Sequence, residues 1–396
     1  MKVLMLWKYY PQYLSYFYEK YPYVVDLPFQ EHRNAMLNDH FGWPGDLSRY
    51  MNNQGIETEF IIVNAESMQK QWARENNFES YSDSGWEKEI AMEQIKRFKP
   101  DILWITAIFD YFGDFIKDAS AHCKKVITWV SCATPDNLDL SGLEVLVTSH
   151  PEMLKDKQHL FNEVVVVKPG FDSEILKKIG NVEKKYDVTF VGSITANHLK
   201  RAETLAYLIE NGIDLKFFGN VGETPKIRKD EIIKQVGKYV SSLQNIRKGI
   251  HIFRDTYLQT SQKHNDYQRH IETIKKVYQG PVFGMKMYRT LAASHITLNI
   301  HIDVAGDHAG NMRMFETTGV GTCLLTEYSE NINDLFEPGK EVLTYISKED
   351  LLSSIKKSLE FDECIESVAK AGQEKTLNDH SIERMFTELE CVFDIE

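Results

Sequence analysis

The chain has 396 residues, a formal net charge of −12 and 42% hydrophobic residues, which predicts a soluble globular protein of about two to three domains. An acidic chain without a clustered basic surface is not expected to bind nucleic acid. Five scattered cysteines without a Cys-x-x-Cys pair fit a reducing compartment. Neither a membrane-spanning run nor a signal peptide is evident, so we expect a cytoplasmic protein. Peripheral contact with the inner face of the membrane is left open.

The first 170 residues predict a mostly parallel sheet covered on both faces, because short apolar runs alternate with helical patterns. The expected strands are Val3 to Trp7, Phe60 to Val63, Ile102 to Thr106, Lys125 to Val130, Val145 to Thr148 and Glu163 to Val167. The expected helices are 47–53, capped by Asp46, and 86–98, 112–122 and 153–161. After Trp7 we expect about 40 irregular residues, and loops of that length are usually functional or disordered.

Tyrosine and phenylalanine are concentrated between Tyr9 and Tyr23. Aromatic faces suit the C–H surfaces of sugars, so this segment is one candidate for an acceptor wall. A hydrophobic lid or a partner surface explains the same residues equally well.

A turn-rich break at Lys168 to Asp172 predicts a domain boundary, after which strands and helices alternate again. We expect an N-terminal domain over 1–170, a C-terminal domain over 171–375, and a helix over 376–396 that packs back on the first domain. The second set of expected strands is Asp187 to Val191, Asp214 to Phe218, Ile296 to Ile302, Thr322 to Thr326 and Glu341 to Tyr345. The second set of helices is 199–211, 288–293, 311–318, 331–336, 348–361 and 365–393.

The segment from about 225 to 280 interrupts this alternation with a long, charged stretch of helical period. We interpret it as an inserted helical pair. Such an insertion is more often a homodimer contact or an acceptor-side arm than a catalytic element, and both roles are left open.

A strand, a polar loop and the start of a helix follow one another between Leu298 and Leu325. The first turn of a helix offers free N–H groups and a positive dipole end to an anion. Arg313 adds a forked cation that matches phosphate oxygens, and Glu316, one turn later on the same face, adds an acceptor for two ribose hydroxyls. The pattern therefore predicts a site for a nucleoside diphosphate.

Several short motifs of the second half together resemble the GT-B-fold glycosyltransferases, and most closely the CgeB-type, glycosyltransferase group 1-like set. The resemblance extends over roughly 185–390, while over 1–170 it is architectural. The motifs are Phe190-Val191-Gly192-Ser193, Leu298-Asn299-Ile300-His301, Arg313-Met314-Phe315-Glu316, Gly319 to Leu325 and Asn333 to Glu341.

This resemblance implies two Rossmann-like doubly wound domains that face a cleft, with a sugar nucleotide on the C-terminal domain and the acceptor on the N-terminal one. It implies that Glu316 binds the ribose and that Arg313, Thr317 and Thr318 lie near the diphosphate. Gly192 and Ser193 would let the backbone approach the phosphates, and Arg201, with Lys200, would add cations. The Glu-x7-Glu pattern of many retaining members has His308 at its first position, so a retaining mechanism is not carried over.

The catalytic base is open among residues expected near sheet edges. Asp39 and His40 precede a Gly-rich loop beside the expected cleft, and Asp136 follows a strand. Ordinary turn chemistry explains each aspartate as well. We place His308 near the donor sugar.

Metal ions and cofactors are not expected. The sequence contains no Asp-x-Asp pair, and the loop residues His301, Asp303, Asp307 and His308 have an unspecific spacing for a metal site. No Gly-x-Gly-x-x-Gly follows an expected strand, which disfavours a dinucleotide-dependent dehydrogenase.

The sequence thus predicts a glycosyltransferase that moves a sugar from a nucleoside diphosphate sugar to a glycan, lipid-linked or protein acceptor. Two alternatives stay open, a nucleotide-sugar epimerase and a non-catalytic scaffold or coat protein with the same fold.

Overall fold

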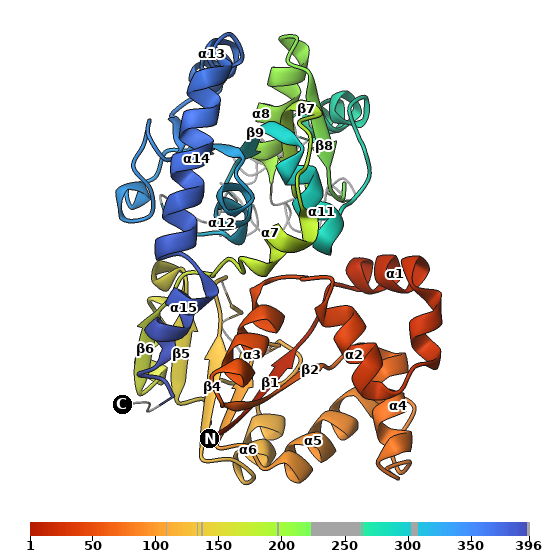
Figure 1. Ribbon diagram of the computed structural model, residues 1–396. Coiled ribbons are helices and arrows are strands. Elements are labelled where there is room, and N and C mark those ends of the chain that lie inside the picture. The colour runs from red at the N-terminus through yellow and green to blue at the C-terminus, as the bar shows by residue number, and fades with distance from the viewer. Residues whose placement is uncertain are drawn as a thin grey trace, which may run out of the picture.

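The structure is a computed structural model that describes residues 1–107, 109–132, 134–135, 138–195, 198–222, 262, 264–301 and 308–393. These residues form two domains, each built on a parallel β-sheet (Figure 1). The predicted α/β class with two covered sheets is confirmed. Within the described ranges, no helix combines the length and the apolar character needed to cross a bilayer.

The N-terminal sheet has six parallel strands in the order β2-β1-β3-β4-β5-β6. Their bounds are β1 Lys2–Trp7, β2 Glu57–Ile62, β3 Ile102–Ile105, β4 Lys125–Trp129, β5 Val145–Thr148 and β6 Glu163–Val166. The central strands are continuous apolar runs because helices cover both faces. The chain leaves β1 first toward β2 and later toward β3, so the strand order reverses beside β1. Ligands of open α/β sheets gather at such a reversal, outside the carboxyl ends of the strands.

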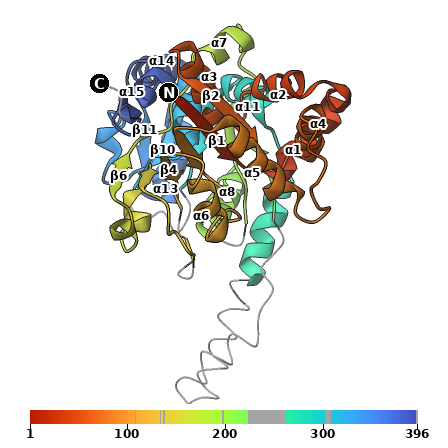
Figure 2. The ribbon, with the colours of Figure 1, turned by 90° about the horizontal axis from the view of Figure 1, so that it is seen from below.

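Helices and 3-10 turns surround this sheet, and two views place α2 and α4 together at one edge of the domain (Figures 1 and 2). The helices are α1 Pro11–Lys20, α2 Phe29–Leu37, α3 Trp43–Asn53, α4 Glu66–Glu75, α5 Trp86–Phe98 and α6 Asp114–Ser120. The 3-10 turns are η1 Pro22–Asp26, η2 Pro151–Leu154 and η3 Gln158–Leu160.

The prediction of an irregular loop after Trp7 is wrong, because α1, η1 and α2 occupy most of this segment. Pro11 stands in the first turn of α1, where its missing N–H is harmless. Tyr13, Leu14 and Phe17 then lie on one face at helical spacing and are buried in the domain core. The aromatic residues that suggested a binding wall are largely this core stripe.

Three further local predictions differ from the structure. Helix α3 begins at Trp43, so Asp46 lies inside its first turn and does not cap it. The helix expected over 153–161 is replaced by the short turns η2 and η3. Helix α4 was not predicted, because it buries only Met68, Gln69 and Ala73 among polar neighbours.

The C-terminal sheet has five parallel strands in the order β11-β10-β9-β7-β8. Their bounds are β7 Tyr186–Val191, β8 Leu215–Phe218, β9 Ser294–Asn299, β10 Cys323–Glu327 and β11 Leu343–Tyr345. The helices after Val167 are α7 Glu174–Ile179, α8 Leu199–Glu210, α11 Gly284–Ala292, α12 Met312–Gly319, α13 Lys348–Leu359, α14 Asp362–Asp379 and α15 Ile382–Leu389. The helix expected over 331–336 is only the 3-10 turn η5, Ile332–Asp334.

The inserted helical pair expected at about 225–280 falls mainly on 223–261, outside the described residues. Residues 264–275 are helical. Their side chains Tyr267, Ile271 and Ile274 are buried in the C-terminal core, so this part of the segment belongs to the domain.

The chain passes between the domains twice, and the two passages are bonded to each other. The N–H of Phe171 donates to the carbonyl of His380 at 2.8 Å, and the N–H of Ile382 donates to the carbonyl of Phe171 at 3.1 Å. Gly170 fits here because a Cβ would lie 2.8 Å from the Ser381 carbonyl oxygen. Beyond this point α15 lies beside the N-terminal sheet (Figure 1) and contacts α3.

Helix α15 completes the N-terminal core, and this makes a testable prediction. Leu389 is fully buried in the cluster that also holds Trp104 and Leu47. We expect Leu389→Ala to lower the free energy of unfolding by about 2–5 kcal/mol, through lost transfer energy and a cavity. Glu383→Ala, on the exposed face of the same helix, serves as the control in urea unfolding. Equal stability of the two variants would contradict this packing.

Candidate functional site

A cavity of about 570 Å³ lies between the two domains. The N-terminal domain contributes residues at or after the carboxyl ends of β1, β4 and β5, and the C-terminal domain contributes those after β7, β8 and β9 and at the start of α12. Both sheets therefore direct their strand ends to one cleft, where open α/β sheets bind ligands.

Arg313 and Glu316 line the C-terminal side of this cleft from the first turns of α12. An Arg313 guanidinium nitrogen lies 2.7 Å from Glu316 Oε2, and Arg313 Nε donates to the carbonyl of Val191 at 3.1 Å. Glu316 is 8% exposed, and Tyr288 donates to its other oxygen at 3.5 Å. Burial raises the pKa of Glu316, while Arg313 and Tyr288 oppose that rise.

The start of α12 is open to the cleft. Asn311 precedes the helix, and its side chain donates to Asn299 Oδ1 at 2.8 Å rather than capping the helix. Both residues line the cleft. The first N–H groups of α12 and its positive dipole end thus lie beside Arg313, an arrangement suited to phosphate oxygens.

Gly192, Ser193 and Arg201 also line the cleft. The Arg201 side chain, however, is already held by hydrogen bonds within the protein. Gly192 lies where β7 and β8 end, and a Cβ there would lie 3.2 Å from the Phe190 ring. Arg201 donates to the carbonyls of Ser193 and Ile300, both at 2.7 Å. Its guanidinium therefore fixes two cleft-lining loops to each other.

Thr317 and Thr318 do not reach the cleft. Both are buried, and Thr318 Oγ1 lies 2.8 Å from the carbonyl oxygen of Met314 and 2.6 Å from Thr376 Oγ1 on α14. On an α-helix, positions one and two after Glu316 point to other faces. The expected contact of these two hydroxyls with a diphosphate is therefore not supported by their placement.

The N-terminal side of the cleft is an aromatic wall. Trp7, Trp43 and Trp129 line it, with ring centroids 5.3 Å apart for Trp7 and Trp43 and 4.7 Å apart for Trp43 and Trp129. Of the segment Tyr9 to Tyr23, only Tyr10 lines the cleft. The sequence reasoning missed this wall, although Trp7 ends a predicted strand and Trp129 is the next-to-last residue of another, and that position is the signal that identifies them.

His150, also missed, follows β5 and lines the same side. Burial, together with the nearby Lys168, His301 and His308, lowers its pKa to about 4. The imidazole is therefore neutral near pH 7, with an Nδ1 that has no hydrogen-bond partner among the described residues.

Asp39 is not in the cleft and is corrected to a structural role. Its side chain is 4% exposed and lies at the start of α11, where a Cβ on Gly284 would collide with it. The N–H of Met285 holds its carboxylate, and Lys20 lies 4.0 Å away. The carboxylate thus binds free N–H groups of a helix in the other domain.

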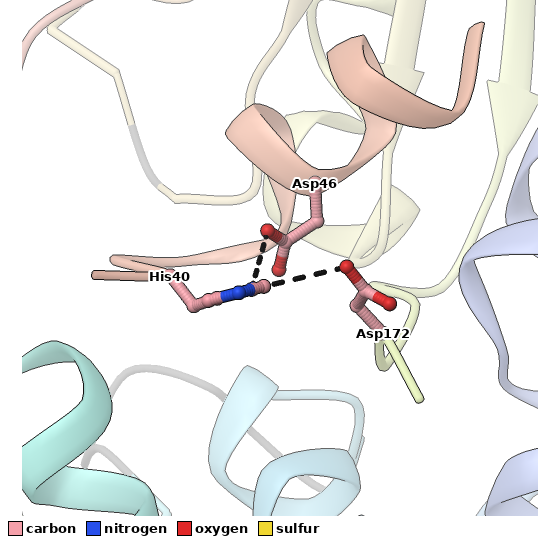
Figure 3. Close-up of side chains that lie close together, drawn as sticks. All are labelled: His40, Asp46 and Asp172. Atoms are coloured by element: carbon pink, nitrogen blue, oxygen red, sulfur yellow. Dashed lines mark ion pairs between the residues drawn. The ribbon is translucent and has the colours of Figure 1, made fainter. Parts of the chain in front are cut away.

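His40 is fully buried, and Figure 3 shows its ring beside Asp46 and Asp172. His40 Nδ1 lies 2.8 Å from Asp46 Oδ1 and 3.8 Å from Asp172 Oδ2. His40 lines the cleft, and Lys178 Nζ lies 2.8 Å from its Nε2, while its Nδ1 makes no hydrogen bond among the described residues. Lys178 therefore occupies the ring nitrogen that would accept a proton, and this placement does not support the expected role as a base.

The trio His40, Asp46 and Asp172 brings three potential metal-ligand atoms within 4.8 Å. Arg49 lies 2.8 Å from Asp46 and 3.5 Å from Asp172. Because Arg49 and Lys178 already supply the positive charge, the residues present fit an ion-pair network better than a cation site.

Asp136 and His308 are the remaining catalytic candidates. Asp136, and Asp303 and Asp307 of the loop cluster, lie outside the described residues. His308 is described, lies close enough to His150 to affect its pKa, and does not line the cleft.

The raised pKa of Glu316 predicts a pH-dependent stability difference. A carboxyl whose pKa is raised on folding binds its proton more tightly in the folded state, so the wild type loses stability as pH rises from about 4.5, the ordinary value, through the raised value. We expect Glu316→Gln to melt above the wild type at pH 7, with the gap narrowing as pH falls through the raised value toward 4.5 and constant below it. The exposed Glu366→Gln is the control in thermal melts. A gap that widens on acidification would contradict the assignment.

Comparison with known proteins supports the fold. A family model described as "Glycosyl transferase-like" matches residues 227–390, and no curated protein matches the chain. A glycosyltransferase from Rickettsia africae is 11% identical, with a TM-score of 0.53 over 99% of this chain and 97% of that one.

Two other solved structures align over the whole chain. Anabaena HepE in complex with UDP and glucose is 10% identical, with a TM-score of 0.53 over 100% of this chain and 99% of that one. Sucrose-phosphate synthase from Thermosynechococcus elongatus is 9% identical, with a TM-score of 0.55 over 100% and 98%. These likenesses concern the fold alone. The chain has the two-domain α/β fold of the GT-B glycosyltransferases.

Proposed function

We propose that this protein is a glycosyltransferase that moves a sugar from a nucleoside diphosphate sugar to an acceptor bound across the cleft. The observation that carries the proposal is the placement of Arg313 and Glu316 on the first turns of α12, facing the cleft beside the end of β7. The glycosyl transferase-like family match covers α12 and supports the same assignment.

On the donor side, Glu316 accepts hydrogen bonds from the ribose hydroxyls, and Arg313 with the first N–H groups of α12 holds the diphosphate. When the bond between the sugar and the diphosphate breaks, negative charge grows on the leaving oxygens. A preorganised cation and helix dipole stabilise that charge most strongly in a partly buried site. This set of groups does the work of a chelated metal, which is why we propose a metal-independent reaction.

On the acceptor side, Trp7 and Trp129 are partly exposed and offer apolar ring surfaces that suit the C–H face of a sugar, while Trp43, 3% exposed, packs against both. His150 supplies a neutral imidazole at this wall, the form that accepts a hydrogen bond or a proton from an acceptor hydroxyl. A glycan or a lipid-linked sugar fits this wall better than an acidic peptide.

Uracil is the first nucleotide base to test. The structure of HepE with UDP-glucose, which is 10% identical to this chain at a TM-score of 0.53, is a neighbour over the full length. The surroundings of the base in this chain are not specified by the likeness, so the titration includes the other bases.

We expect calorimetric titration without added metal to give binding by one of UDP, GDP, dTDP or ADP. Arg313→Ala removes a charge-assisted contact, which is worth about 1.5–3 kcal/mol, so the dissociation constant should rise roughly tenfold or more. Arg384→Ala is the matched control, because Arg384 is an exposed arginine on α15.

Failure of all four nucleotides to bind the folded wild type would contradict the donor site and favour a scaffold protein. Equal loss of affinity in both arginine variants would show that the effect is not local to Arg313.

A further inference from the structure

The segment 38–43 of the N-terminal domain contacts three helices of the C-terminal domain. The Asn38 side chain and carbonyl accept from Lys178 of α7, at 3.3 and 3.4 Å. Asp39 binds the start of α11, as described above. At Gly42 a Cβ would lie 3.4 Å from Met312, the first residue of α12. The segment therefore contacts α7, α11 and α12.

The ring of His40 lies between Lys178 of the C-terminal domain and Asp46 of the N-terminal domain. Lys178 is a donor only, so its 2.8 Å approach to Nε2 requires that nitrogen to be the acceptor. The ring proton is therefore assigned to Nδ1, which lies 2.8 Å from Asp46 Oδ1 in an ion-pair contact without hydrogen-bond geometry. A charge on one domain fixes the tautomer and orientation of a ring in the other domain, as a supporting partner does for a metal-bound histidine.

The backbone at this point is held in an uncommon conformation. His40 has a φ of 50° and Gly42 a φ of 83°, both in the left-handed region. A non-glycine residue stays there only when surrounding contacts hold it. Residues 40–44 line the cleft immediately after this turn, and Trp43 belongs to the aromatic wall.

We propose that Lys178 and His40 are positioning residues that hold the acceptor wall at a fixed distance from the donor helix. This inference rests on the proposed function for its catalytic consequence, because a sugar must bridge the two sides of the cleft. His40 acts through the backbone of residues 40–43, which carries Trp43 into the wall and places Gly42 against Met312. Loss of the link leaves the donor site intact on the C-terminal domain but lets the wall move, and small displacements of reacting groups are costly to turnover.

The test uses Lys178→Met, with Lys177→Met as the matched control. Lys177 is the next residue on the same helix and pairs only with Glu174 among the described residues. Hydrogen–deuterium exchange is measured on the whole chain without ligand. Loss of one charge-assisted bond should speed exchange in 38–43 and at Met285 by about tenfold in Lys178→Met, and Lys177→Met should match the wild type. Unchanged exchange in Lys178→Met would overturn the link.

A second measurement separates positioning from folding and from the proposed function. With a UDP-sugar as probe and water as the acceptor of the sugar, we expect Lys178→Met to keep the UDP affinity and melting temperature of the wild type. Hydrolysis of the bond between the sugar and the diphosphate, which releases UDP and the free sugar, should slow by about tenfold or more. Lys178→Arg, which also donates to an imidazole, should restore the rate. A parallel loss of UDP affinity, or a slow rate that Arg does not restore, would overturn positioning. If the wild type binds no UDP, the proposed function fails, and the exchange result still decides the link.

Discussion

Arg313 and Glu316 are held together at 2.7 Å where α12 begins, and the donor half of the cleft depends on this pair. A buried carboxylate is costly without a partner, and the raised pKa of Glu316 reflects that cost. Without ligand, each charge satisfies the other. In the proposed donor complex, the phosphates of the nucleotide would replace Glu316 at the guanidinium and its ribose hydroxyls would replace Arg313 at the carboxylate. Binding in this way would not require a new charge to be buried alone.

The pair is useful only because the two sheets direct their strand ends to one cleft. Phe171 and the segment 380–382 bond the two passages of the chain to each other, and α15 anchors the C-terminal segment in the N-terminal core. Asp39, His40 and Lys178 add polar contacts across the same gap. The domains are therefore joined by backbone hydrogen bonds and by polar side-chain contacts.

The sequence predicted the sheet strands and the donor helix well because local patterns determine them. Buried parallel strands appear as short apolar runs, and β9, α12 and β10 follow the expected order around Arg313. The first fifty residues were harder, because aromatic residues at helical spacing look alike whether they line a ligand or a core. Tyr13 and Phe17 are core residues, whereas Trp7 and Trp129 form the wall.

Residues whose role depends on a distant partner were beyond sequence reasoning. Asp39 looked like a cleft carboxylate in a turn, but its partner is Met285, in the other domain. His40 looked like a base, but Lys178 occupies its acceptor nitrogen. Thr318 lies two residues after Glu316, yet the helical turn directs it to Thr376. In each case a contact between residues far apart in the chain decides the chemistry.

The most direct test of the account is a crystal structure with the nucleoside diphosphate that binds in calorimetry. The account predicts that the ribose hydroxyls lie within hydrogen-bond distance of Glu316, and that the diphosphate contacts Arg313 and the first N–H groups of α12. The sugar-bearing phosphate would face the wall of Trp7, Trp43 and Trp129. A nucleotide bound elsewhere, with Arg313 and Glu316 still paired to each other, would contradict it.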